Sequence, residues 1–153
     1  MKNLILLVCS FIVSIAFSQE IVIKNGLYFQ NEVAYSGVQT VYFENGTVKE
    51  TLNIKDGKLN GEVIKYYVNG TKREVGNYEN NLKFGLWTRF NSNGLLIAEA
   101  SYKNDKKDGS WMVYDDKGMK LFKMEYKDGE KVGTWIQWDE NGTVLKTTDY
   151  AAL

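Results

Sequence analysis

The sequence predicts an all-β protein, a single-layer antiparallel meander of five 24-residue β-hairpin repeats preceded by an N-terminal capping hairpin. Two series of glycines recur every 24 residues, and pairs of turn-forming residues recur in step with them. No stretch between these turns reaches the ~10–12 residues that a helix needs. The lead glycines are Gly37, Gly61, Gly85, Gly109 and Gly133, and the second glycines are Gly46, Gly70, Gly94, Gly118 and Gly142.

Residues 1–18 have the features of a secretory signal peptide. Met1-Lys2-Asn3 is a short basic start, the next 14 residues are apolar apart from two serines, and small residues stand at Ala16 and Ser18. The apolar run is short of the ~20 residues that span a bilayer, so we expect no transmembrane segment in the mature chain. We therefore expect a protein exported to the periplasm or the cell exterior, beginning near Gln19.

The segment 19–36 is predicted to form the N-terminal capping hairpin. Gly26-Leu27-Tyr28-Phe29 and Val33-Ala34-Tyr35 have the composition of two short strands around Gln30-Asn31-Glu32.

The repeats then occupy 37–60, 61–84, 85–108, 109–132 and 133–153. Asparagine precedes four of the second glycines, as Asn45, Asn69, Asn93 and Asn141. We expect a two-residue turn at each second glycine, with φ > 0 at both turn residues. A second turn of the same kind is expected at Asp56-Gly57, Asn80-Asn81, Asn104-Asp105 and Asp128-Gly129.

The aromatic residues follow the same period. If every turn has two residues, strand alternation places one aromatic row on one face, formed by Trp87, Trp111, Trp135, Tyr78, Tyr102, Tyr126 and Tyr150. A second row then lies on the opposite face, formed by Tyr66, Phe90, Tyr114 and Trp138 beside Ile64, Met112, Ile136, Ile97, Leu121 and Leu145. Such rows can stabilise a thin sheet through cross-strand pairs, or they can contact a ligand.

The composition disfavours catalysis, metal binding and nucleic-acid binding. The chain has no His, a single Cys that lies inside the signal segment, and 19 basic against 19 acidic residues. The acid pairs Asp115-Asp116 and Asp139-Glu140 stand just before predicted turns, where Asp is a turn former. Asn104, Asp105 and Asp108 do not form a calcium-loop pattern. We therefore expect no enzyme activity, no catalytic or metal-binding residues and no cofactor.

The repeat unit, Gly-x-Trp-x-x-Tyr-x-x-Asn-Gly followed by Tyr and an Asp-Gly-Lys-x-x-Gly stretch, resembles the MORN repeat, and more closely its bacterial variant. Lys127-Asp128-Gly129-Glu130-Lys131-Val132-Gly133 carries the best local match. The opening Gly26-Leu27-Tyr28-Phe29 resembles YwqK-like members, which are labelled antitoxins. The resemblance implies an elongated stack of hairpins, and scaffold or binding roles rather than chemistry.

Three functions follow as hypotheses. The first is a non-enzymatic protein-binding or scaffold module that uses the face with Trp87, Trp111, Trp135, Tyr78, Tyr102 and Tyr126 to bind an unidentified protein partner. The second is a cell-envelope adhesion module that binds a glycan or a lipid headgroup. The third is an antitoxin-like or immunity protein. No nucleic-acid partner is expected.

Overall fold

The computed structural model describes residues 20–150, and in this range the all-β prediction is confirmed. A small three-stranded sheet contains β1 (Ile21–Lys24), β2 (Leu27–Gln30) and β3 (Val33–Ala34). A ten-stranded sheet contains β4 (Gly37–Tyr42), β5 (Val48–Lys55), β6 (Lys58–Tyr66), β7 (Lys72–Glu79), β8 (Leu82–Phe90), β9 (Leu96–Lys103), β10 (Lys106–Tyr114), β11 (Lys120–Lys127), β12 (Glu130–Trp138) and β13 (Val144–Tyr150). The predicted signal segment, 1–18, lies outside the described residues.

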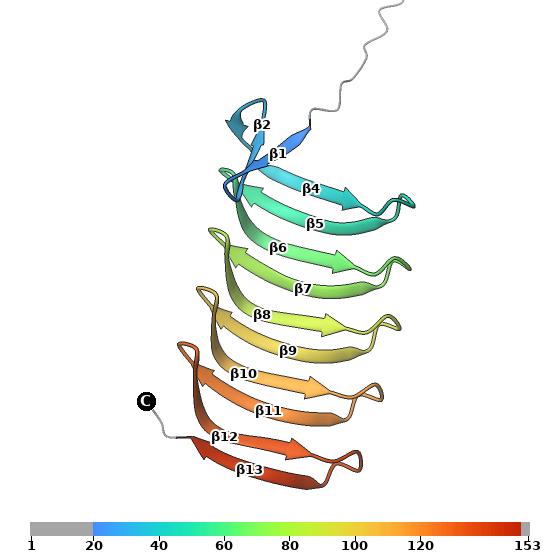
Figure 1. The fold of residues 1–153 in the computed structure, drawn as a ribbon, viewed down its shortest axis with the longest axis vertical. Coiled ribbons are helices and arrows are strands. Elements are labelled where there is room, and N and C mark those ends of the chain that lie inside the picture. The colour runs from blue at the N-terminus through green and yellow to red at the C-terminus, as the bar shows by residue number, and fades with distance from the viewer. Residues whose placement is uncertain (1–19, 151–153) are drawn as a thin grey trace, which may run out of the picture.

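The ten strands follow one another in chain order, and every neighbouring pair is antiparallel. Figure 1 shows the result as a stack of hairpins, with the turns that hold the second glycines on one side and the intervening turns on the other. Within the long sheet each strand therefore pairs only with its sequence neighbours, which is the organisation of a repeat protein. In the part of the chain that the structure describes, no helix is long and apolar enough to cross a membrane.

The turns at the second glycines differ from the prediction. In the first one, Phe43 donates its N–H to Thr47 O and Gly46 donates its N–H to Phe43 O, both at 2.8–2.9 Å. The loop thus has three residues, and Gly46 alone has a positive φ, of +82°. This is a type I turn closed by a glycine bulge, a common alternative to the two-residue turn. The expectation of φ > 0 at Asn45, Asn69, Asn93 and Asn141 is wrong, because each occupies the third of the four positions of a type I turn, where φ is negative.

A side-chain oxygen supports each of these turns. Asn45 Oδ1 accepts the N–H of Thr47, and Asn69 Oδ1 accepts that of Thr71, each at 3.1 Å. In the last three repeats the acceptor moves to the first residue of the turn, namely Asn91, Asp115 and Asp139. Two backbone N–H groups are bound by each of Asn91, Asp115 and Asp139. This explains why Asn or Asp, which are turn-forming residues, stand at these positions.

The turns on the other side of the stack are as predicted. At Asp56-Gly57, Asn80-Asn81, Asn104-Asp105 and Asp128-Gly129, both residues have positive φ. The flanking residues pair directly, as in Lys55 with Lys58. These are two-residue turns of the type that matches the right-handed strand twist.

Four of the lead glycines, Gly61, Gly85, Gly109 and Gly133, mark a bend in the strand. Leu52 pairs with Val63 and Ile54 with Leu59, so β6 advances four residues while β5 advances two. The same register shift recurs in β8, β10 and β12. At the bend in β8, Gly85 has φ +70°, which a residue with a Cβ adopts at a cost. The 24-residue period of the lead glycines is therefore the period of this bulge.

The N-terminal segment forms the predicted hairpin from β2 and β3, with β1 as an additional strand. Tyr28 donates its N–H to Gly57 O, and Gly57 donates its N–H to Tyr35 O, both at 2.8 Å. These bonds attach the small sheet to the first two-residue turn of the long sheet. Its aromatic rings pack on the core cluster of Leu52, Ile54 and Val63, which are 6%, 4% and 1% exposed. The N-terminal segment therefore covers one face of the sheet at the β4 end.

Candidate functional site

Seven rings form one continuous row on a face of the long sheet, and we call this row the aromatic ladder. Its members, in order, are Tyr78, Trp87, Tyr102, Trp111, Tyr126, Trp135 and Tyr150. Consecutive ring centroids lie 4.8–6.3 Å apart, and the rings are tilted or edge to face. The prediction that these residues share a face is confirmed. Such geometries add stabilisation beyond area burial.

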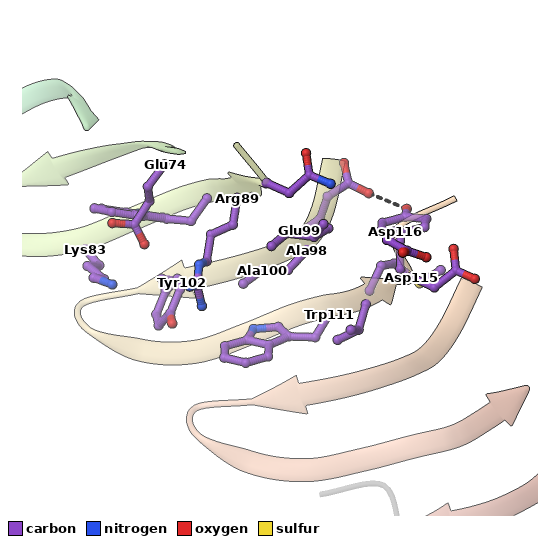
Figure 2. Close-up of a pocket in the computed structure, with 16 residues that line it drawn as sticks. Glu74, Lys83, Arg89, Ala98, Glu99, Ala100, Tyr102, Trp111, Asp115 and Asp116 are labelled. Carbon is purple, nitrogen blue, oxygen red and sulfur yellow. Dashed lines mark hydrogen bonds between the residues drawn. The ribbon is translucent and has the colours of Figure 1, made fainter. Parts of the chain in front are cut away.

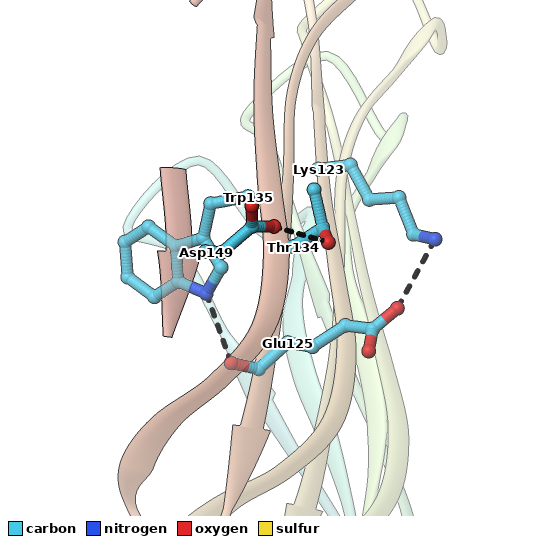
Figure 3. A network of polar contacts seen from close by, with 5 residues as sticks. All are labelled: Lys123, Glu125, Thr134, Trp135 and Asp149. Carbon is cyan, nitrogen blue, oxygen red and sulfur yellow. Dashed lines mark hydrogen bonds and ion pairs between the residues drawn. The ribbon is translucent and has the colours of Figure 1, made fainter. Parts of the chain in front are cut away.

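Each ladder tryptophan is fixed by its indole N–H. Trp87 Nε1 donates to Asn77 O at 3.2 Å, Trp111 Nε1 to Ser101 O at 3.3 Å, and Trp135 Nε1 to Glu125 O at 3.0 Å. The three acceptors are 24 residues apart, so the repeat preserves the bond. Figure 3 shows Trp135 on this carbonyl, with the Lys123–Glu125 ion pair of 3.1 Å extending away from the indole and Thr134 bonded to Asp149. The indole donors are thus not free to bind a ligand.

A lysine ammonium lies over each tryptophan ring of the ladder. The distance to the Trp ring centroid is 4.1 Å for Lys83, 3.9 Å for Lys107 and 4.7 Å for Lys131, and each ammonium also lies 4.6–5.3 Å from the next tyrosine ring. These are cation–π contacts. The sequence did not lead us to expect these contacts, although the three lysines are also 24 residues apart. Lys107, which is part of a basic run in the sequence, is therefore a structural residue.

The second aromatic row lies on the opposite face, as predicted. Directly paired residues share a face, and Ile64, Val75, Thr88, Glu99, Met112, Lys123 and Ile136 form one continuous series of such pairs. Tyr66, Phe90, Tyr114 and Trp138 each stand two residues beyond a member of this series. Tyr114 Oη donates to Glu99 Oε2 at 2.7 Å and thereby places its ring on this face.

Ile97, Leu121 and Leu145 occupy β-bulges. Arg89 pairs with Ala98 and Phe90 with Leu96, so Ile97 has no partner of its own. The same shift isolates Leu121 and Leu145. Strand alternation, from which we predicted their face, does not apply at a bulge.

A groove of about 590 Å³ lies on the ladder face over β8 to β10. Its floor is formed by Ala98 and Ala100 of β9, which pair with Arg89 and Trp87 on one side and with Val113 and Trp111 on the other. Figure 2 shows Arg89 and Trp111 on either side of this floor, with Tyr102 and Lys83 toward one end of the groove and Asp115 and Asp116 toward the other. The volume is within the usual range of ligand sites.

Two small residues create this groove. One repeat further on, the positions of Ala98 and Ala100 are occupied by Phe122 and Met124. The alanines leave the space that those larger side chains fill in the next unit. The groove is therefore a local departure from the repeat and not a property of every unit.

The charges around the groove are mostly paired. Lys65 Nζ binds Glu74 Oε2 at 3.0 Å, and Glu99 accepts the hydroxyl of Tyr114. That hydrogen bond raises the pKa of Tyr114 from 10.0 to about 12. Burial raises the pKa of Tyr102. Arg89 stands opposite Glu74 in the neighbouring strand and is exposed, and its guanidinium makes no hydrogen bond or ion pair within residues 20–150.

Acidic residues that the sequence offered as candidate catalytic or calcium-binding groups instead accept backbone N–H groups at the turns. Asp115 Oδ1 accepts the N–H groups of Met119 and Lys117, and the bond to Met119 is the main cause of its lowered pKa. Asp105 Oδ1 accepts the N–H of Lys83 at 2.7 Å, and Asp108 binds both Lys127 and the N–H of Asp128. Over the described range 20–150, no group of three or more His, Cys, Asp or Glu side chains could hold a metal ion.

The fold and the site define a class, a β-hairpin repeat protein built as one sheet with an aromatic ladder on one face. The family model described as MORN repeat variant matches residues 35–56, 85–104 and 131–152. These three matches support the presence of MORN-type repeats in the chain. A search of the curated proteins finds no match. Repeats of this family are generally protein- or membrane-binding modules.

Proposed function

We propose that this protein is an exported, non-enzymatic binding or scaffold module that recognises a partner protein through the ladder face. The observation that carries the proposal is the groove over Ala98 and Ala100, a ligand-sized hollow of about 590 Å³ on the ladder face that exceeds the hollow of about 240 Å³ beside Trp135 and Tyr150. An immunity role of the kind attributed to YwqK-like antitoxins would be one instance of such binding, with a toxin as the partner.

Two features of the ladder favour a protein partner over a glycan or a cationic headgroup. A sugar or a choline group stacks on an exposed aromatic face, and here lysine ammonium groups already lie over the tryptophan rings. The indole N–H groups, which could donate to sugar hydroxyls, are bonded to the backbone. The groove offers apolar walls and a free guanidinium instead.

The test is capture from a cell-envelope extract with the full chain as bait. We expect one stoichiometric protein to be retained by the natural chain and lost in Trp111→Ala. The matched control is Trp138→Ala, which removes the same side chain from the opposite face and is expected to retain the partner. Equal capture by both variants, or no captured protein, would refute the proposal. Retention on peptidoglycan or lipid vesicles that depends on Trp111 would favour the adhesion function.

Export is the second part of the proposal and rests on the signal-peptide features of residues 1–18. We expect N-terminal sequencing of the protein made in its native cell to begin at Gln19. A mature protein that still begins at Met1 would contradict export by cleavage.

A further inference from the structure

Among the described residues, the Arg89 guanidinium is the cationic group of the groove that has neither an ion pair nor a ring beneath it. Its cross-strand neighbour, Glu74, is bound by Lys65 at 3.0 Å, which leaves the positive charge of Arg89 uncompensated by a direct contact. Arg89 is near enough to Tyr102 to lower the pKa of that hydroxyl, against the larger effect of burial. A guanidinium with five N–H donors in a fixed fork is suited to a carboxylate, which it can bind with two parallel hydrogen bonds.

The surroundings of Arg89 are apolar. Ala98 pairs directly with Arg89, Ala100 lies two residues further along β9, and the indoles of Trp87 and Trp111 flank that floor. A branched or aromatic side chain would fill the space above the alanines, as Phe122 and Met124 do in the next repeat. An occupant therefore needs an apolar group close to its carboxylate.

The extent of the groove indicates an extended chain. Its lining comes from β7, β8, β9 and β10. Four strands at ~4.8 Å spacing extend over roughly 14 Å, which is the length of about four residues of extended peptide at ~3.3 Å each.

The acidic residues at the other end of the groove argue against an anionic bilayer. Asp115 and Asp116 line this end, and Asp116 is exposed and makes no ion pair within the described residues. A surface of anionic headgroups would meet these carboxylates as well as Arg89, whereas a short peptide can place one acidic group at Arg89 alone.

We propose that the groove binds an extended segment of a partner protein, with an acidic side chain paired to Arg89 and an adjacent apolar side chain on the Ala98–Ala100 floor. This inference rests on the proposed function, because it names the partner chemistry of the same face.

The experiment is selection of a phage-displayed random peptide library on the immobilised full chain. We expect the enriched peptides to share an Asp or Glu next to a branched or aromatic residue. The affinity of a selected peptide is expected to fall at least tenfold in Arg89→Glu, which reverses the charge. It is expected to fall similarly in Ala98→Phe, which fills the groove with the residue of the next repeat.

The matched control is Arg73→Glu. Arg73 is also exposed, does not line the groove, and gives the same change in net charge. Its peptide affinity is expected to stay within twofold of the natural chain, and all variants should show the same circular dichroism spectrum. If Arg73→Glu and Arg89→Glu lose affinity equally, the effect is one of net charge and the inference fails.

The remaining outcomes separate this inference from the proposed function. Peptides whose binding depends on Trp111 but not on Arg89 or Ala98 would overturn the inference and leave the proposed function intact. Peptides that are insensitive to all three positions would overturn both. No enriched peptide, or Arg89-dependent binding to vesicles of phosphatidylcholine and phosphatidylglycerol, would overturn the inference.

Discussion

Replacing Gly76 by Ala tests how tightly the ladder is packed on the sheet. Gly76 is buried in β7 beneath the indole of Trp87, the most deeply buried ring of the ladder at 3% exposed. A Cβ at Gly76 would lie 2.1 Å from Trp87 Cδ2, 2.3 Å from Cε2 and 2.6 Å from Cε3. All three distances are far below van der Waals contact, so the indole or the strand must move.

The magnitude follows from what holds the indole in place. Trp87 is bonded to Asn77 O at 3.2 Å and packs against Tyr78 at 5.1 Å, so moving it disrupts the first contacts of the ladder. Overpacking a core costs about 1–3 kcal/mol. Removing glycine from a strand returns roughly 0.5–1 kcal/mol. With the indole contacts also lost, we expect a net destabilisation of about 2–3 kcal/mol, or a fall in Tm of roughly 5–10 °C for a chain of this length.

The assay is thermal and urea denaturation followed by tryptophan fluorescence, and two comparisons isolate the cause. Gly46→Ala places a Cβ in open space at φ +82°, so it carries only the backbone cost of roughly 1–2 kcal/mol. In a Trp87→Leu background, Gly76→Ala should be nearly neutral, because the clashing ring is gone. A Tm for Gly76→Ala within about 2 °C of the natural chain would refute the packing argument.

Three further changes probe the turns, the lysines and the opposite face. Gly94→Val should destabilise the chain by about 1–2 kcal/mol, because a β-branched residue resists the φ of +84° found there; Gly94→Asn should cost less, and unchanged melting of the valine variant would contradict the turn. Lys107→Met should destabilise the chain by about 0.5–1 kcal/mol, because its contacts with Trp111 and Tyr126 are lost. Urea denaturation can measure this loss against the exposed control Lys106→Met. Equal effects of the two substitutions would argue against a cation–π contribution. Because the pKa of Tyr114 is raised from 10.0 to about 12, its hydrogen bond to Glu99 stabilises the fold fully below pH 10 and is lost between pH 10 and 12. Ultraviolet difference titration against Tyr114→Phe should show this late-ionising phenol, and ionisation near pH 10 would refute the assignment.

The repeat predicted the fold because it combines several signals with one period. Glycines, turn residues and aromatics all recur every 24 residues, and each independently indicates the same hairpin. The two-residue turn at Asp56-Gly57 could be predicted because both residues tolerate φ > 0. The turn at Asn45-Gly46 could not be assigned correctly, because Asn-Gly fits both a two-residue turn and the end of a type I turn with a glycine bulge. The backbone hydrogen bond between Phe43 and Thr47 shows which of the two turns is formed, and the composition of the segment does not reveal this bond.

The candidate site was predicted only in part, and for a related reason. Alternation placed the ladder residues on one face, because the bulges at the lead glycines shift the register by two residues and preserve parity. The groove depends instead on Ala98 and Ala100, two small residues whose effect appears only when the facing strands are known. The unpaired charge of Arg89 depends on Glu74 binding Lys65 rather than Arg89, which no spacing in the sequence reveals.

The chain-order pairing of the ten strands has a mechanical consequence. The described chain enters the fold at the β4 end of the stack and leaves at β13, so tension between its ends acts across the strands rather than along them (Figure 1). Under such a load the hydrogen bonds between neighbouring strands break one after another and do not resist the force together. Each hairpin would release 24 residues, roughly 80 Å of extended chain at ~3.3–3.6 Å per residue. A protein built in this way would unfold in equal steps at low force, so the distance between its ends would grow before any covalent bond is loaded strongly.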